Sequence, residues 1–168
     1  MTLRVRALDH DDPERIARAS EAVGWNKPVE TYEGYLAEQA AGLRAVLVAE
    51  VDEAFAGYLT IVWRSPYPHF RERGVPEVKD FSVLPAFRRR GVGTALMDAA
   101  ETLVRERTSV VGIGVGMDSD YGPAQAMYVR RGYVPDAHGL TSHGRHVRWG
   151  DTVKVDDDLV LYFTKSLR

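Results

Sequence analysis

Hydrophobic residues follow two spacings along the chain, and each spacing predicts a type of secondary structure. Two runs rich in β-branched and aromatic residues, at 43–51 and 54–63, flank Asp52-Glu53 and predict a β-hairpin. Shorter apolar runs predict further strands at residues 3–8, 77–84, 110–116 and 158–167. Pro85 should end the strand at 77–84, because proline cannot donate a hydrogen bond to a neighbouring strand.

Apolar residues spaced three and four positions apart predict helices. The longest such face belongs to a helix that begins near Gly91, and it contains Leu96, Ala99, Ala100, Leu103 and Val104. A helix is predicted to open at Pro13 with Asp11 or Asp12 as its cap, and a weaker one at 31–41. Another helix is predicted at 123–131, with Gly132 as its C-terminal cap.

The order of these elements indicates the fold class. Strands alternate with helices, which favours a layered α/β-type (α+β) domain, and the hairpin adds antiparallel pairing, so the sheet should be mixed. The chain of 168 residues has no internal repeat and no linker rich in Pro, Gly or Ser. We therefore expect a single domain over residues 1–168.

The composition excludes several classes of function. Hydrophobic residues make up 45% of the chain and charged residues 27%, which is typical of a globular domain. The net charge of −2 gives no overall basic field, so we expect no nucleic-acid partner. Without cysteine there is neither a disulfide nor a thiol nucleophile, and no apolar run resembles a signal peptide or a membrane span. We expect a cytoplasmic protein with no membrane partner.

The stretch FRRRGVGTALMDAAE at 87–101 places Arg88, Arg89 and Arg90 at the start of a predicted helix, where the helix dipole disfavours positive charge. The first N–H groups of a helix lack intrahelical partners, and Gly91 and Gly93 would let an anion approach the backbone. The stretch therefore predicts a site for a ligand with several negative charges, such as a pyrophosphate. The alternative is a solvated arginine cluster on a surface loop.

Two other phosphate-binding motifs do not fit the sequence. No G-x-x-x-x-G-K-[ST] stretch is present, so a P-loop is excluded. Gly112, Gly114 and Gly116 suggest a dinucleotide fingerprint, but Met117 and Ser119 occupy the places that would need glycine. The phosphate site is therefore predicted from the arginine stretch alone.

Two stretches together resemble a known family. VLPAFRRRGVGTALMDAAE at 83–101 resembles motif A of the GNAT superfamily of N-acetyltransferases, Q/R-x-x-G-x-G/A, which Arg88, Gly91 and Gly93 match. AQAMYVRRGYVP at 124–135 resembles the family segment A-x-x-L-Y-x-x-x-G-F, with methionine and tyrosine in place of leucine and phenylalanine. The two stretches occur in the family's order, each on the expected element.

The resemblance implies a fold and a cosubstrate. The expected fold is a mixed, mostly antiparallel sheet of six to seven strands flanked by about four helices. Strands 77–84 and 110–116 would splay apart to hold acetyl-CoA. Strand residues near Val83 would pair with the pantetheine, and loop and helix N–H groups would hold the pyrophosphate. The implied cofactor-binding residues are Phe81, Ser82, Val83, Arg88, Arg89, Arg90, Gly91, Val92, Gly93 and Thr94.

The implied activity is transfer of an acetyl group to a primary amine by direct attack on the thioester. The amine must first lose a proton, and a carboxylate could accept it directly or through water. Glu77 stands where some family members carry a catalytic glutamate, and Asp80 is the runner-up. Strict strand alternation would place Glu77 on the face of Val83 and Asp80 on the other. Tyr128 matches the tyrosine that protonates the departing thiolate, and the Val83 N–H would stabilise the oxyanion.

One position departs from the family pattern. The family often has an asparagine seven residues before the catalytic tyrosine, in contact with the cofactor, and Tyr121 occupies that place here. Cofactor contacts from the start of this helix are therefore open.

The acceptor site should come from the variable segments of the fold. Residues 24–36 offer Trp25, Tyr32 and Glu33 as an apolar and acidic lining for a cationic amine, and the alternative is an ordinary amphipathic helix. Residues 65–76 are predicted to be a loop that could cover a cleft, and residues 136–158 a long connection. The connection contains His138, His143 and His146 without a paired carboxylate motif, so we expect no metal.

Other functions remain open at this point. The main alternative to an enzyme is a non-catalytic acetyl-CoA sensor or a degenerate family member, which would keep the phosphate loop. A nucleic-acid adaptor would depend on two short arginine runs alone. The acceptor could be a small molecule or a peptide amine, and a homodimer is possible because dimers are common in the family.

Overall fold

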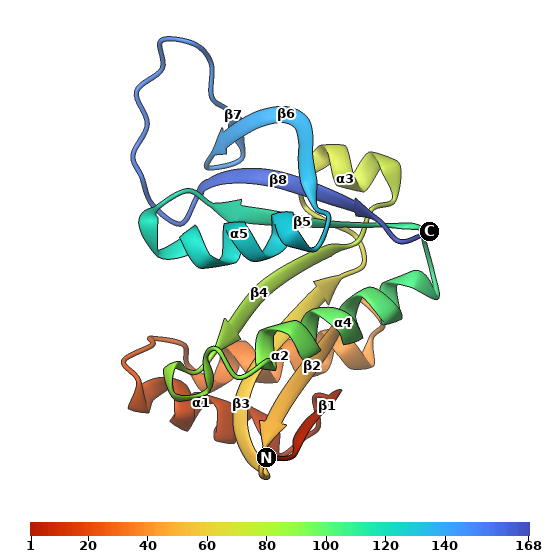
Figure 1. Cartoon of the computed structure of the whole chain (residues 1–168), viewed down its shortest axis with the longest axis vertical. Coiled ribbons are helices and arrows are strands. Elements are labelled where there is room, and N and C mark those ends of the chain that lie inside the picture. The colour runs from red at the N-terminus through yellow and green to blue at the C-terminus, as the bar shows by residue number, and fades with distance from the viewer. The chain divides into compact units, whose positions relative to one another are not determined.

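The computed structural model describes all 168 residues, and its elements are labelled in Figure 1. The chain forms two compact units. The first consists of Met1–Trp63 and Val78–Glu106, and the second of Arg64–Glu77 and Arg107–Arg168. The expectation of a single domain over residues 1–168 stays a prediction, and each unit is described by itself.

Four strands make up the sheet of the first unit. Their order is β1 (Leu3–Ala7), β2 (Arg44–Val51), β3 (Ala54–Val62) and β4 (Glu77–Val83), whose first residue belongs to the second unit. β2 pairs antiparallel with both β1 and β3. The turn between β2 and β3 holds Asp52 and Glu53 at φ angles of 49° and 66°, the backbone of a tight two-residue hairpin turn. The predicted hairpin is confirmed.

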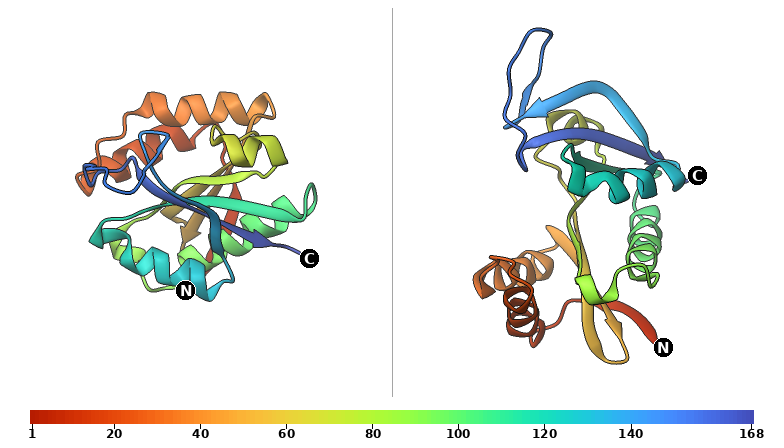
Figure 2. Two further views of the ribbon diagram at one scale, coloured as in Figure 1. Left: turned by 90° about the horizontal axis from the view of Figure 1, so that it is seen from above. Right: turned by 60° about the vertical axis from the view of Figure 1, so that its left-hand side comes forward.

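Three helices cover this sheet. Helices α1 (Asp12–Ala22) and α2 (Val29–Ala40) lie on one face, and α4 (Val92–Arg105) lies on the other (Figure 2). The predicted apolar face of α4 is confirmed: Leu96, Ala100 and Val104 are fully buried, and Ala99 and Leu103 are half-buried at its edges. The core under α1 and α2 consists of Leu8, Ile16, Tyr32, Val46, Val48, Phe55, Tyr58 and Leu84.

The predicted side-chain cap of α1 is wrong. The helix begins at Asp12, and its N-cap residue Asp11 makes no capping hydrogen bond. The buried carboxylate of Asp12 instead accepts two hydrogen bonds from the Arg6 guanidinium, at 2.6 and 2.8 Å. Burial alone would raise the pKa of Asp12, but the bonds from Arg6 and from the Asp9 N–H outweigh it and lower that pKa. Asp12 therefore ties α1 to β1.

The second unit also contains four strands. Their order is β5 (Val110–Gly116), β8 (Leu159–Ser166), β6 (Val134–Ser142) and β7 (Arg145–His146), and each pairs antiparallel with its neighbour. Helices α3 (Pro68–Arg73) and α5 (Gly122–Arg130) lie on opposite faces of this sheet (Figure 2). Gly132, with φ of 91°, follows α5 and confirms the predicted C-terminal cap.

Two segments are more regular than the sequence predicts. Residues 65–76 were expected to be a loop but contain α3, and residues 136–158 contain most of β6 and all of β7. Helix α3 has only six residues, too few to show a helical period. Strand β6 is largely exposed and lacks the alternation that marks a half-buried strand.

The mostly antiparallel α+β class is confirmed, with one correction. There are eight strands rather than six to seven, and the five α-helices agree with the expected number of about four. The extra strands, β6 and β7, lie mostly in residues 136–158, whose structure the sequence did not predict. The splaying of 77–84 from 110–116 stays a prediction, because the two strands belong almost wholly to different units.

The glycines of β5 are explained by packing. A Cβ on Gly112 would lie 2.3 Å from the ring of Phe70, and one on Gly116 would lie 2.5 Å from the ring of Tyr121. A Cβ on Gly114 would lie 2.9 Å from Val160. Each glycine therefore makes room for a side chain next to the strand, which agrees with rejecting the dinucleotide fingerprint.

Candidate functional site

The connection from β4 to α4 forms an open loop in the first unit. A short 3-10 turn at Pro85–Phe87 follows the strand, and α4 begins at Val92. Between them, Arg89 and Gly91 have φ angles of 57° and 81°, so the backbone turns twice through the left-handed region. This double turn leads the chain directly into the first turn of the helix.

The N-terminus of α4 has the character of an anion site. No side chain caps it, and its first turn contains no acidic residue. The three preceding arginines are exposed, and only weak contacts orient two of them: the Arg90 guanidinium lies 5.3 Å from the Phe87 ring, and Arg88 Nε donates to the Val83 carbonyl at 3.3 Å. Uncapped N–H groups and three cations together favour a ligand with several negative charges.

The glycines of this loop leave the backbone accessible. A Cβ on Gly91 would meet no other atom within 4 Å, so the space beside it is open. A Cβ on Gly93 would lie 3.4 Å from the ring of Phe81, in ordinary contact with β4. The residues present therefore fit a phosphate group that approaches the main chain at the start of α4.

Strand β4 is irregular in the middle. Asp80 has φ of 54°, a left-handed conformation that is uncommon for a residue other than glycine. At the start of the strand, the neighbouring residues Glu77 and Val78 are both buried. The left-handed residue interrupts the strand, so the predicted strict alternation of faces along 77–83 does not hold through Asp80.

The irregular strand places the Asp80 carboxylate in a cluster of donors within the first unit. Its Oδ2 accepts hydrogen bonds from the Tyr35 hydroxyl at 2.7 Å and the Tyr58 hydroxyl at 2.8 Å. Its Oδ1 forms an ion pair with the Lys27 ammonium, which also donates to the Tyr58 hydroxyl at 2.8 Å. Burial raises the pKa of both tyrosines, and Asp80 raises it further, first through its hydrogen bond to Tyr35 and through its charge near Tyr58. Sequence reasoning missed Lys27, Tyr35 and Tyr58 as partners of Asp80.

Glu77, the other predicted base, is buried within the second unit. Only 3% of its surface is exposed, and one carboxylate oxygen accepts a hydrogen bond from Ser65 Oγ at 2.5 Å. Ser65 Oγ in turn accepts the Tyr67 N–H at 3.0 Å, which fixes the hydroxyl between the two groups. Burial, with smaller effects from the charges of Glu77 and Asp136, raises the pKa of Tyr162 to about 12.

Tyr128, the predicted acid, lies on α5 in the second unit. The side chain is 5% exposed, and its ring packs edge-on against that of Tyr133, with 5.8 Å between the ring centroids. Burial, and then the neighbouring Tyr121, raise the pKa of Tyr128 above its ordinary value near 10. The hydroxyl therefore stays protonated at neutral pH.

The three predicted acceptor residues lie in different environments. Tyr32 is fully buried in the core, and its hydroxyl is 3.1 Å from Ser20 Oγ, so its position favours the packing alternative. Glu33 is exposed on α2. Trp25 is half-buried and lines a groove of about 490 Å³ whose other lining residues are Glu14, Ala17, Arg18, Glu21, Asn26, Lys27, Pro28 and Val29.

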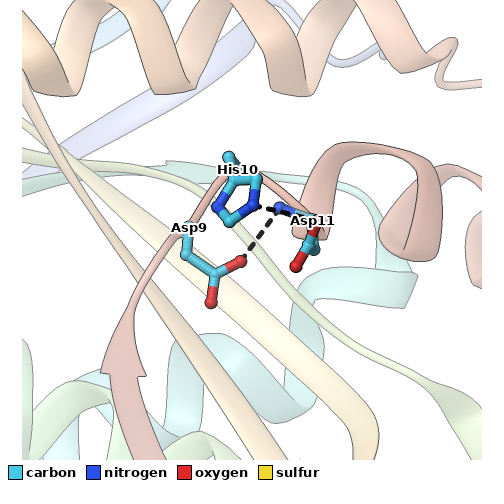
Figure 3. A group of neighbouring side chains, drawn as sticks. All are labelled: Asp9, His10 and Asp11. Carbon is cyan, nitrogen blue, oxygen red and sulfur yellow. Dashed lines mark hydrogen bonds and ion pairs between the residues drawn. The ribbon is translucent and has the colours of Figure 1, made fainter.

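Two groups of histidine and aspartate have atoms close enough together to hold an ion. Asp9, His10 and Asp11 form the turn before α1, where Asp9 Oδ1 accepts the Asp11 N–H at 3.0 Å (Figure 3). The other group is His143 with Asp156 and Asp158, and each ring nitrogen faces a different carboxylate. Internal hydrogen bonds and ion pairs account for both arrangements, so neither is assigned to a metal.

Solved structures share this fold along nearly the whole chain. A GNAT-family protein of Desulfovibrio desulfuricans matches 99% of this chain and 100% of its own, with a TM-score of 0.74 and 19% identity. Ard1 of Thermoplasma volcanium matches 99% and 98%, with a TM-score of 0.72 and 21% identity. The yncA protein of Salmonella typhimurium, solved with its cofactor acetyl-CoA, matches 100% and 95%, with a TM-score of 0.70 and 19% identity. At such identities the likeness shows the fold.

The comparison of sequences identifies the family of this chain. No curated protein matches the sequence. No helix combines the length and apolar character needed to cross a membrane. The family model described as Acetyltransferase (GNAT) family matches residues 9–133, well over half of the chain, and this range includes the loop from β4 to α4 and Tyr128. The chain therefore belongs to the GNAT acetyltransferase family.

Proposed function

We propose that the protein is an acetyl-CoA-dependent N-acetyltransferase that moves an acetyl group to a primary amine by direct attack on the thioester. One observation carries the proposal beyond family membership: α4 begins with uncapped N–H groups beside three exposed arginines. Such an arrangement costs helix stability unless an anion binds there, because the helix dipole repels cations at this end. The pyrophosphate of acetyl-CoA would supply that anion.

The first unit would hold the cosubstrate. Backbone N–H groups from Arg89 to Thr94 would bind the pyrophosphate, and the guanidinium groups of the loop would neutralise its charge. The backbone of Phe81 to Val83 would pair with the pantetheine as an added strand. Bound acetyl-CoA supplies the activated acetyl group as a thioester. The Val83 N–H is the candidate donor to the oxyanion.

Glu77 is the preferred general base. An alkyl ammonium has a pKa of about 10, so the acceptor must lose a proton before its nitrogen can attack. Asp80 is the weaker candidate, because its carboxylate already accepts from two phenols and pairs with the Lys27 ammonium. Those three partners already occupy both carboxylate oxygens, so the acceptor amine would have to compete with them for contact with Asp80.

Tyr128 is the proposed general acid. In the family motif that this helix matches, the position of Tyr128 holds the tyrosine that protonates the departing thiolate. Burial keeps its hydroxyl protonated, as this role requires. We propose that the acceptor is a small-molecule or peptide amine, with Trp25 and Glu33 as its remaining contact candidates, since Tyr32 is enclosed in the core.

Release of free thiol from acetyl-CoA, followed across a panel of small amines, peptides and aminoglycosides, tests this proposal. Release that depends on the amine would support an acetyltransferase and would identify the acceptor class. Tight binding of acetyl-CoA without release for any amine would favour the alternative of a non-catalytic sensor. Absence of both release and binding would contradict the proposal.

A further inference from the structure

Three of the five histidines lie close together in the second unit. They come from α3, β6 and β7 and are His69, His138 and His146. The rings of His69 and His138 stack with centroids 3.5 Å apart and planes at 16°. The His69 and His146 rings meet through their Nε2 atoms, which are 3.2 Å apart.

The separation of these two nitrogen atoms is that of two ligands on one metal ion. Imidazole nitrogens bind zinc at about 2.0–2.1 Å, so a tetrahedral pair of them lies roughly 3.3 Å apart. The Nε2 atoms of His69 and His146 already stand at 3.2 Å without any rearrangement of the backbone. Without a metal, one ring must donate and the other accept, so the same contact can also be a histidine pair that shares a proton.

The neighbouring residues hold His138 against the His69 ring. Its Nδ1 lies 3.3 Å from a carboxylate oxygen of Asp136, and only 1% of the Asp136 side chain is exposed. The same Asp136 oxygen accepts the Tyr67 hydroxyl at 2.7 Å, and the other oxygen accepts the His138 N–H at 3.0 Å. These contacts fix His138, and its stacked ring supports the His69 ring from one side.

We propose that the second unit binds one divalent transition-metal ion, of the zinc, nickel or copper class, through Nε2 of His69 and of His146. Water completes the coordination, and the stacked His138 ring supports His69 without binding the ion. Imidazole ligands suit this class of metal. The site does not depend on acetyl transfer, and it would link α3 to β7 across 77 positions of sequence. This metal site departs from the expectation of no metal. The sequence could not suggest the site, because nothing in the sequence relates these two histidines.

Titration of the untagged full-length protein with zinc in a calorimeter tests the proposal. We expect one saturable site per chain. His69→Ala and His146→Ala should each weaken zinc binding about ten- to hundredfold, as loss of a metal-binding contact does. His10→Ala and His143→Ala are the matched controls, since both residues are exposed histidines beside aspartates and should leave the affinity unchanged.

Two further measurements complete the test. Cobalt in place of zinc should give visible absorption bands that disappear in His146→Ala, a variant on an exposed two-residue strand that should fold even if His69→Ala does not. Far-ultraviolet circular dichroism confirms folding of each variant. No saturable zinc binding by the wild-type protein, or equal binding by His146→Ala, would overturn the proposal and leave a proton-sharing histidine pair. Equal loss in the two controls would also overturn it.

Discussion

The Lys27 ammonium and the Asp80 carboxylate form an ion pair inside the first unit, and the Tyr58 hydroxyl bonds to both partners. The pair joins the segment before α2 to the irregular centre of β4. Asp80 has a left-handed φ of 54°, and its conformation must be held by its surroundings. The three donors on its carboxylate are the contacts that hold it.

The two partners of this pair should therefore differ in their effect on stability. Lys27→Met removes one partly exposed charge and should cost about 1 kcal/mol of the free energy of unfolding. Asp80→Asn leaves the ammonium without a counterion and weakens two phenol hydrogen bonds, so it should cost more, about 2–3 kcal/mol. Urea denaturation measures both, with the exposed Lys154→Met as control. An Asp80→Asn variant as stable as Lys27→Met would contradict this account of the cluster.

Replacement of Glu77 should separate catalysis from folding. Glu77→Gln keeps an oxygen to accept the Ser65 hydroxyl hydrogen bond but cannot take up a proton, so kcat should fall about a hundred- to ten-thousandfold. The affinity for acetyl-CoA and the thermal midpoint should change little. Ser65→Ala, which keeps the carboxylate, is the matched variant and should retain more activity. If Asp80→Asn lowers kcat more than Glu77→Gln at equal folded fraction, Asp80 rather than Glu77 is the general base.

Tyr128→Phe should lower kcat about a hundredfold or more while acetyl-CoA binds as before, because only the proton donor is lost. Burial raises the pKa of Tyr128 above its ordinary value, so the folded enzyme should keep this proton up to and beyond about pH 10. The neutral form also stabilises the fold, and that contribution is present below about pH 10 and is lost as the pH rises through the raised pKa. Steady-state kinetics at several pH values provides the check. Unchanged turnover in Tyr128→Phe would remove Tyr128 from the mechanism.

Two glycine-to-alanine changes should have opposite effects on stability. Gly112→Ala places a Cβ 2.3 Å from the buried Phe70 ring and should cost about 1–3 kcal/mol through overpacking. Gly34→Ala adds a methyl group in open space inside α2 and should stabilise the protein by about 0.5–1 kcal/mol. Denaturant titrations compare the two. A neutral Gly112→Ala would mean that Phe70 does not pack against β5 in solution.

The parts of the molecule that the sequence predicted are those set by neighbouring residues. The hairpin follows from the two β-forming runs on either side of Asp52-Glu53, and the C-terminal cap from the freedom of Gly132 to adopt a left-handed φ; both are confirmed. The apolar face of α4 and the arginine loop before it are also contained within one short stretch. Such features need no knowledge of the rest of the chain.

The parts that the sequence missed depend on contacts between different elements of the fold. Lys27 and Asp80 are 53 positions apart, and Asp12 turns from a helix cap into a partner of Arg6 because β1 lies beside α1. Neither contact leaves a periodic signal. The left-handed backbone at Asp80 is a further example, since aspartate in a run of strand formers gives no local indication of an irregular strand. Tertiary contacts determine all three features: the Lys27–Asp80 ion pair, the Asp12–Arg6 pair and the backbone of Asp80.

The central claim is that the start of α4 binds the pyrophosphate of acetyl-CoA, and calorimetric titration of acetyl-CoA tests it most directly. The wild-type protein should bind one molecule per chain, and the double variant Arg89→Gln, Arg90→Gln should bind about tenfold more weakly or worse. That variant should be as stable as the wild type or slightly more stable, because two cations leave a helix N-terminus. Arg130→Gln, in the last turn of α5, is the control. Equal affinity in the wild type and the double variant, or no binding by either, would contradict the claim.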